Sequence, residues 1–326
     1  MNQFQYIRST ETAGAVKALG KDPGAYFLAG GTNLIDLMKM GIVVPEKLVD
    51  INQLPLKKIE SIPGGLRIGA LATNSEVAEH ALVKKNFPLL SMAINAGASP
   101  QLRNMATVGG NMMQRTRCPY FFDMLMPCNK RNPGSGCGAL EGYNRMHAIF
   151  GASETCIAVN PSDMNVALTA LDASVLISGP KGVRRIPFAD LHRLPGDHPE
   201  LDNNLQKAEL ITAVELTTSP FTKNVDYLKV RDRTSYAFAL VSAAVGLHIE
   251  NNTIVHATVA MGGVAHKPWR LKTVETFLTS KHPAEAVFKE AAAVAMEGAK
   301  AYAHNQYKLK LAPNTLVQAL KTAAGV

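Results

Sequence analysis

All four cysteines of this 326-residue chain lie in a single segment, between positions 118 and 156. Prolines and glycines recur from Met112 to Thr155, so neither helical nor strand periodicity persists there. An irregular segment of that length inside a compact domain needs its own source of order. Four thiolates brought together would supply one, so the sequence predicts a metal ion or cluster held by Cys118, Cys128, Cys137 and Cys156.

The spacing of these cysteines does not identify the metal. Structural zinc sites usually contain cysteine pairs about two to four residues apart, and no two cysteines are that close here. Cluster-binding cysteines also often come in close runs. An iron–sulfur cluster and a zinc ion both stay open, and free thiols or disulfides are a third alternative. A cluster would serve redox chemistry, whereas zinc would only hold the segment in shape.

Other residues of the same segment suit a cluster of thiolates. Gly134, Gly136 and Gly138 are expected to direct backbone N–H groups toward its sulfurs. Four nearby cations are expected to offset the negative charge of the thiolates: Arg115, Arg117, Lys130 and Arg131.

Two glycine pairs precede the cysteines. Gly30-Gly31 follows an apolar stretch and leads into a helical pattern that Thr32 or Asn33 could cap, and Gly109-Gly110 stands in a similar loop. Backbone N–H groups at such turns can approach an anion, and the helix dipole favours its charge. Neither loop is a dinucleotide fingerprint or a P-loop, and a lone Gly-Gly turn is usually only a turn. Two together can hold both phosphates of a dinucleotide, and a thiolate site beside them indicates electron transfer.

Charge and hydropathy limit the classes of partner. The net charge is +8, but the cations are spread along the chain without interleaved aromatic residues, so we expect an anionic cofactor and an acidic protein partner rather than nucleic acid. No apolar run reaches the roughly 18 residues that span a bilayer, so no membrane insertion is expected. The N-terminus carries no secretory signal, which predicts a cytoplasmic protein; export attached to a partner is the alternative.

Periodicity divides the chain into three parts, at residues 1–58, 59–221 and 225–326, with the irregular insertion at about 112–156. Strands are expected at 25–29, 47–51, 66–70, 156–159, 174–178, 210–216, 226–230, 237–249 and 253–260. Helices are expected at 10–19, 33–40, 75–80, 88–96, 163–171, 284–303 and 315–323. Strands followed by helices in the last part predict an antiparallel sheet with helices on one face, and the whole chain is of the α+β class.

The order of short motifs along nearly the whole chain resembles the FAD-binding medium subunit of the xanthine dehydrogenase family of molybdenum hydroxylases. The residues that carry the resemblance are Ala29–Asn33, Gly69–Thr73, Gln101–Asn104, Thr107–Asn111, Ser162–Met164, Lys229–Arg231 and Ser235–Val241. The cysteine-bearing insertion, with Arg117–Phe121 and Pro127–Arg131, narrows it to the flavin subunits of bacterial periplasmic aldehyde oxidoreductases, which carry an additional [4Fe–4S] cluster.

The resemblance implies a fold and a set of cofactor contacts. The fold is a two-subdomain FAD-binding fold of the vanillyl-alcohol-oxidase (PCMH) type, followed by a C-terminal domain of the CO-dehydrogenase-flavoprotein type. The FAD pyrophosphate would be held by Tyr26, Phe27, Leu28, Ala29, Gly30, Gly31, Thr32, Asn33 and Leu34, and by Thr107, Gly109, Gly110 and Asn111. Asp163 would accept hydrogen bonds from ribityl or ribose hydroxyls, Ile211 would offer backbone contacts, and Lys229 would lie by the isoalloxazine. On the residues alone, a helix cap is the more common role for Asp163, and Lys229 is as easily a solvated strand end.

The resemblance also implies an activity shared with other chains. A large molybdopterin subunit would oxidise the aldehyde, and a small subunit with two [2Fe–2S] clusters would pass electrons to FAD and then to an external acceptor. The redox centre of this chain would be FAD, so no residue of it is expected to be catalytic. Two alternatives are a stand-alone flavin oxidoreductase with a zinc-bound loop and a basic binding module without redox chemistry.

Overall fold

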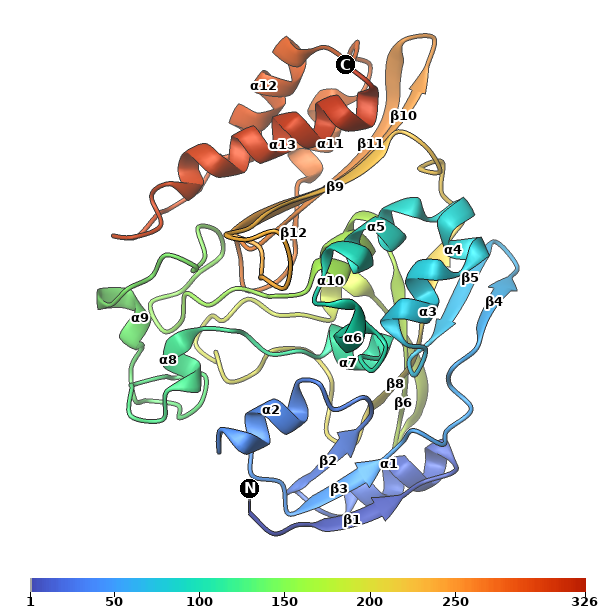
Figure 1. Cartoon of the computed structure of the whole chain (residues 1–326), viewed down its shortest axis with the longest axis vertical. Helices are drawn as coiled ribbons and strands as arrows, with labels where there is room; N and C mark the ends of the chain where they lie inside the picture. Colours follow the sequence, from blue (N-terminus) through green and yellow to red (C-terminus); the bar gives the residue numbers. More distant parts are fainter. Residues whose placement is uncertain (1) are drawn as a thin grey trace.

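Three β-sheets follow one another along the long axis of the molecule in the computed structural model, which describes residues 2–326 (Figure 1). The N-terminal sheet lies at one end, and the C-terminal sheet with its helices lies at the other. The cysteine-bearing insertion lies to one side of the middle of the molecule, with the short helices α8 (Pro119–Phe122) and α9 (Gly138–Glu141). Mixed helices and sheets confirm the α+β class.

The N-terminal sheet is parallel, in the order β1-β3-β2. Its strands are β1 (Gln5–Arg8), β2 (Ala25–Leu28) and β3 (Lys47–Asp50), and its helices are α1 (Thr12–Gly20) and α2 (Leu34–Lys39). Ala15 and Val16 of α1 pack with Val49 of β3 in a small core that also includes Leu71 and Leu210 of the central part. The strand β1 was not expected from the sequence.

The central sheet is antiparallel, in the order β4-β5-β8-β6-β7. Its strands are β4 (Ile59–Ile62), β5 (Gly65–Gly69), β6 (Ser174–Gly179), β7 (Gly182–Pro187) and β8 (Leu210–Thr217). The surrounding helices are α3 (Asn74–Glu79), α4 (Ala81–Asn86), α5 (Pro88–Ala96), α6 (Pro100–Arg103), α7 (Val108–Met112), α10 (Asp163–Ala170) and the 3₁₀ turn η1 (Phe188–Asp190). Every residue of α10 is buried, because this helix lies between the central and C-terminal sheets.

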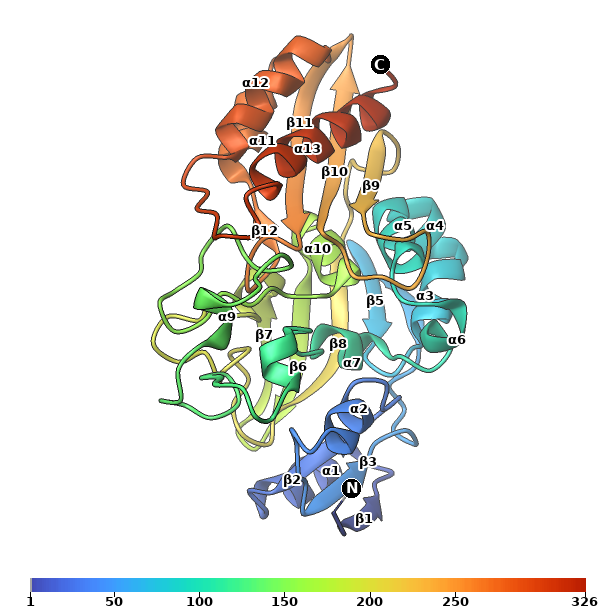
Figure 2. The same ribbon diagram turned by 60° about the vertical axis from the view of Figure 1, so that its left-hand side comes forward.

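The C-terminal sheet is antiparallel, in the order β12-β11-β10-β9, with α11, α12 and α13 on one face (Figure 2). Its strands are β9 (Val225–Val230), β10 (Val241–Glu250), β11 (Thr253–Gly262) and β12 (Trp269–Arg270), and its helices are α11 (Lys272–Leu278), α12 (Glu285–Ala295) and α13 (Lys308–Ala324). The predicted sheet backed by helices is therefore confirmed.

Several expected elements differ from the structure. The helix expected over 315–323 begins at Lys308, and the strand expected over 237–249 begins at Val241. The helix expected over 284–303 ends at Ala295, and three residues later Gly298 has a left-handed backbone with φ of +77°. The strand expected over 156–159 does not form. Its backbone groups bond to separate segments, since the Ile157 carbonyl accepts from Ala148 and the Asn160 N–H donates to Ala265, so no ladder can develop.

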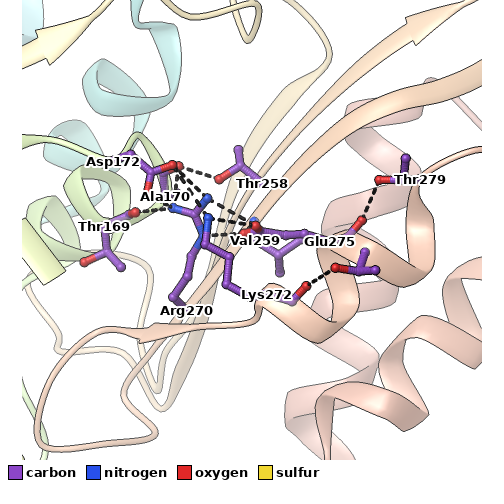
Figure 3. A network of polar contacts seen from close by, with 10 residues as sticks. Thr169, Ala170, Asp172, Thr258, Val259, Arg270, Lys272, Glu275 and Thr279 are labelled. Carbon is purple, nitrogen blue, oxygen red and sulfur yellow. Dashed lines mark hydrogen bonds and ion pairs between the residues drawn. The ribbon is translucent and has the colours of Figure 1, made fainter.

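Arg270 of β12 joins the central part of the chain to the C-terminal sheet (Figure 3). Its guanidinium donates to the carbonyls of Thr169 and Ala170 at the end of α10, the latter at 2.8 Å. It also pairs with Asp172 at 3.1 Å and with Glu275 of α11. One planar fork of donors therefore satisfies helix-end carbonyls and two carboxylates.

Candidate functional site

Both glycine pairs line one cavity of about 570 Å³ between the N-terminal and central sheets. Most of the residues expected to contact FAD lie in its wall: Tyr26, Phe27, Ala29, Gly30, Gly31, Thr32, Asn33, Leu34, Thr107, Gly109, Gly110 and Ile211. Leu28 and Asn111 lie beside this cavity without lining it, and Asp163 and Lys229 lie elsewhere. We call it the large cavity.

Close backbone approach explains the glycines. A Cβ at Gly30 would stand 1.9 Å from the carbonyl oxygen of Met105, just ahead of the second glycine pair. Gly31 has a φ of +73°, which disfavours other residues. A Cβ at Gly109 would come within 3.1 Å of Ala70. The two segments therefore meet only because side chains are missing.

The ends of the two helices at this cavity differ from the sequence expectation. The second glycine pair lies inside the first turn of α7, where Thr107 Oγ1 accepts from the Gly110 N–H at 3.2 Å. Asn33 occupies the N-cap position of α2 but forms no side-chain cap. Its Oδ1 instead accepts from the backbone N–H of Arg115 at 3.0 Å, so it ties α2 to the start of the insertion. Helix capping by Thr32 or Asn33 is therefore wrong.

A second cavity of about 250 Å³, the small cavity, contains Asp163 in its wall. Asp163 is the first residue of α10, whose N-cap is Ser162. Its carboxylate accepts from Lys229 Nζ at 2.8 Å and from the hydroxyl of Tyr227 at 2.7 Å. Burial and the neighbouring carboxylate raise the pKa of Tyr227 well above its ordinary value, so the phenol keeps its proton and donates. Asp163 is thus a buried, fixed acceptor rather than a helix cap.

Lys229 lies behind this carboxylate. Its side chain is 3% exposed, and its ammonium also donates to the Ala96 carbonyl at 3.0 Å. The residue lines neither the large nor the small cavity. Lys229 therefore acts on the small cavity only indirectly, through its ion pair with Asp163. A hydrogen bond links the wall of the small cavity to α7 beside the large cavity, because Ser162 Oγ donates to Asn111 Oδ1 at 2.7 Å.

The four cysteines line one narrow pocket together, the cysteine pocket. Cys128 and Cys156 are buried, and a backbone bridge pairs Cys128 with Cys137. Burial raises the pKa of Cys118 to about 12 and that of Cys156 to about 11 when the thiols are free. Within residues 2–326, no three His, Cys, Asp or Glu side chains are grouped closely enough to hold one metal ion. Four cysteines in the wall of one pocket supply the soft donors that iron–sulfur clusters and zinc sites both use.

The glycines of the insertion do not direct their N–H groups at sulfur. Gly134 and Gly136 donate to Asn129 Oδ1 at 3.1 and 2.8 Å, and Gly138 donates to the Pro127 carbonyl at 2.9 Å. Asn129 accepts both bonds because the chain folds back around its side chain. The expected donors to sulfur are therefore wrong for this segment.

The four cations around the insertion have other partners. Arg115 and Lys130 both pair with Asp202 at 2.6 Å, and Arg117 pairs with Asp36 at 3.1 Å. Arg131 donates to the carbonyls of Tyr120, Phe121 and Met126. Each therefore anchors the insertion to itself or to the rest of the chain.

Several residues line the two cavities although the sequence did not predict them there. Arg115 and Lys207 line the large cavity, and Arg117, His147 and Phe238 line the small one. His147 lies 3.1 Å from Cys118 through its Nε2. Its burial, together with the charge of Lys308, lowers its pKa to about 4, so the ring is neutral. Only the charge of the two arginines drew attention, and nothing local marks a lone histidine or phenylalanine as part of a cavity.

Family models match almost the whole chain. Residues 2–218 match the FAD binding domain in molybdopterin dehydrogenase, and residues 226–323 match the CO dehydrogenase flavoprotein C-terminal domain.

Individual proteins are similar over the same length. The aldehyde oxidoreductase FAD-binding subunit PaoB of Escherichia coli is 49% identical, and the match covers 99% of both chains. The glyceraldehyde dehydrogenase medium chain of Sulfolobus acidocaldarius is 29% identical over 86% of this chain and 82% of its own. In the solved structure of CO dehydrogenase from Oligotropha carboxidovorans, a chain 24% identical has the same fold, with a TM-score of 0.79 over 99% of this chain and 98% of that one. The chain belongs to the family of FAD-binding subunits of the molybdenum hydroxylases.

Proposed function

We propose that this chain is the FAD- and [4Fe–4S]-containing electron-transfer subunit of a heterotrimeric, molybdenum-dependent aldehyde oxidoreductase. The observation that carries the proposal is the meeting of both glycine pairs at one cavity in a chain that belongs to an FAD-binding family. The 49% identical relative, named as an aldehyde oxidoreductase subunit, supports the substrate class.

FAD would occupy the large cavity with its diphosphate against Gly30-Gly31 and the first turn of α7. There the N–H groups of Gly30-Gly31, just ahead of α2, would favour negative charge. The N–H groups of Gly109 and Gly110 already donate to the Ala70 carbonyl and to Thr107 Oγ1, so the first turn of α7 would contribute close backbone approach instead. Ile211 would form part of the wall, and Arg115 would add a cation at its edge. This assignment uses twelve of the residues expected from the sequence.

The flavin end of FAD would reach the small cavity, on the other side of the hydrogen bond between Ser162 and Asn111. Each carboxylate oxygen of Asp163 accepts one of these two hydrogen bonds, Oδ1 from Tyr227 and Oδ2 from Lys229. Each oxygen therefore keeps a lone pair that could accept from a ribityl hydroxyl. Bound FAD accepts two electrons and can release them singly. Lys229 would favour added negative charge there through Asp163, since its side chain is buried and its charge poorly screened.

The cysteine pocket would hold the [4Fe–4S] cluster. Four thiols face one space, and the set of soft donors suits iron–sulfur clusters and zinc alike. The cluster is favoured over zinc because the cysteine pocket shares Thr116 and Cys118 with the small cavity, and a cluster there would have a redox purpose beside the flavin.

The aldehyde would be oxidised on a large molybdopterin subunit, and a small subunit with two [2Fe–2S] clusters would deliver the electrons. This chain would pass them through FAD to an external acceptor. No helix within residues 2–326 is long and apolar enough to cross a membrane. Cytoplasmic location, or periplasmic location by export with a partner, stays a prediction.

The test is the metal and flavin content of the assembled complex, with absorption and EPR spectra after reduction by dithionite. We expect one FAD per copy of this chain. We also expect more iron than the small subunit accounts for, by the amount of one [4Fe–4S] cluster. A complex that lacks flavin would overturn the proposal. Zinc without the additional iron, together with turnover by this chain alone, would establish the stand-alone flavin oxidoreductase instead. A chain without visible absorbance, whose binding weakens steeply with salt, would be the basic binding module.

A further inference from the structure

The imidazole of His147 lies against the sulfur of Cys118. Its Nε2 is 3.1 Å from Sγ, and the residue is 2% exposed. Within residues 2–326, no other cysteine sulfur has a side-chain hydrogen-bond partner; Cys156 receives only the backbone N–H of Ala158, at 3.5 Å. Cys118 is also the cysteine that lines the small cavity. The contact with His147 therefore distinguishes Cys118 from the other three cysteines. Cys118 lies on the side of the cysteine pocket that faces the proposed flavin site.

The C-terminal domain holds His147 in place. The carbonyl of His147 accepts from Asn305 Nδ2 at 3.2 Å and from Lys308 Nζ at 2.9 Å. Asn305 lies in the loop before α13, and Lys308 is the first residue of that helix. Because the backbone of His147 is tied on this side, its ring has a fixed direction toward Cys118.

The direction of the hydrogen bond follows from the chemistry of a bound sulfur. A cysteine that ligates iron carries no proton, so its sulfur only accepts. The hydrogen between the two atoms must then stand on Nε2 of His147. The other ring nitrogen, Nδ1, is buried without a partner, so it loses least as the unprotonated acceptor.

We infer that His147 is a positioning residue of the proposed cluster: it donates N–H to the Cys118 thiolate, orients that ligand and stabilises the reduced cluster. The inference rests on the proposed function, since it needs iron in the cysteine pocket. Reduction adds negative charge to the cluster, and donors to its sulfurs stabilise that charge and raise the reduction potential. Cys118 is the ligand on which such a donor acts, since the imidazole of His147 contacts its sulfur.

The test compares His147→Leu, which removes the donor, with His147→Gln, which keeps an N–H on a side chain of similar length. His256→Leu, at an exposed position of β11, is the control. In the assembled complex, an EPR-monitored redox titration should shift the midpoint of the [4Fe–4S] signal to more negative values in His147→Leu. We expect about a tenfold fall in the ratio of reduced to oxidised cluster at a fixed potential, which is about 59 mV for one electron. His147→Gln should recover part of the shift, and His256→Leu should show none.

Two outcomes would overturn the inference. One is a His147→Leu complex that keeps its iron and has the wild-type midpoint. If that variant loses iron, the wild-type complex decides: with ¹⁵N-labelled histidine, pulsed EPR of the reduced cluster should show weak coupling to an imidazole nitrogen, and absence of this coupling would contradict the hydrogen bond. A wild-type complex without the additional iron would overturn the proposed function itself, so the two failures are distinguishable.

Discussion

At the scale of single residues, the site depends on places where a side chain would not fit. Gly30 is the clearest, because any Cβ there would meet the Met105 carbonyl at 1.9 Å. The conflict is with backbone, which cannot rotate away as a side chain can. The approach of the two glycine-bearing segments, and with it the shape of the large cavity, therefore rests on this missing atom.

We predict that Gly30→Ala loses FAD and destabilises the protein by about 1 to 3 kcal/mol. The measurement is FAD content of the purified complex together with urea unfolding. Gly14→Ala in α1 is the matched control, since a Cβ there meets only Ser9 Oγ at 3.4 Å. That change should keep FAD and gain roughly 0.5 to 1 kcal/mol from helix propensity. Full FAD content in Gly30→Ala would contradict the packing argument.

Lys308 makes stability depend on pH. Its buried ammonium donates to the carbonyls of His147 and Gly263, and burial, aided by the charge of Arg145, lowers its pKa from 10.5 to about 7. Between these pH values the unfolded chain holds a proton that the folded chain does not. The free energy of unfolding must then rise with pH across this window and fall as pH drops through about 7.

Substitution isolates this contribution from those of other groups. We expect the difference in free energy of unfolding between wild type and Lys308→Met to increase as pH rises above about 7. Urea unfolding at several pH values on both sides of 7 measures it. Lys310→Met, on the same helix but exposed, should give a difference that does not change with pH. A flat difference for Lys308→Met would show that the lysine is not buried as described.

At the scale of elements, the junction around Arg270 holds α10 to the C-terminal sheet (Figure 3). The Arg270 side chain is 13% exposed and that of Glu275 is 10% exposed, whereas Lys272 in the same network is 65% exposed. Removal of one partner from a buried pair leaves the other charge uncompensated. The strength of this junction should therefore depend on Arg270 and hardly at all on Lys272.

We predict that Arg270→Met lowers the free energy of unfolding by about 3 to 5 kcal/mol. Lys272→Met should change it by no more than about 0.5 kcal/mol. Arg270→Lys should lie close to Arg270→Met, since a single ammonium cannot reproduce the planar fork. Chemical denaturation of the three variants under one set of conditions checks the order. Equal effects of Arg270→Met and Lys272→Met would refute it.

Elements with a local signal could be predicted from the sequence. The helix α3 carries a capping box between Thr73 and Glu76, and α5 begins at a proline. The strand β1 was missed because every residue of it is exposed, so no alternation of apolar and polar residues marks it. The strand expected at 156–159 was read from apolar residues that are buried against two different segments.

Residues of the candidate site likewise could be predicted from the sequence only where a local motif marks them. The glycine pairs and the four cysteines were found because each motif is contiguous or unique in the chain. The pairing of Asp163 with Lys229, and the contact of His147 with Cys118, join residues far apart in sequence. Their side chains also have ordinary structural uses, so only the tertiary fold reveals what they contact.

At the scale of the whole molecule, the cysteine pocket and the large cavity share no lining residue. Only Met113 and Arg115 of the residues lining the large cavity belong to the insertion at 112–156. The insertion is anchored to the rest of the chain by the pairing of Lys130 with Asp202 and by the bonds of Lys308. Loss of the cluster should therefore leave the diphosphate contacts in place.

We predict that Cys137→Ser loses the additional iron but keeps FAD. Iron and flavin are quantified in the purified complex, and limited proteolysis should show new cleavage between residues 118 and 156. Glu154→Ser, an exposed change in the same segment, should keep both cofactors. Loss of FAD along with iron would mean that binding of FAD depends on the proposed cluster.

Aldehyde turnover of the Cys137→Ser complex then tells whether the proposed cluster conducts electrons or only orders the insertion.

The position of α10 has a mechanical consequence. The first residue of this helix is held by Tyr227 and Lys229 of β9, and its last carbonyls are held by Arg270 of β12. Those two strands are the opposite edges of the C-terminal sheet. Both ends of α10 are therefore attached to the C-terminal sheet, one end to each edge strand. The helix cannot slide or rotate without breaking one of these attachments. A twist of the sheet, such as a partner pressing on its outer helices would cause, must move the carboxylate of Asp163.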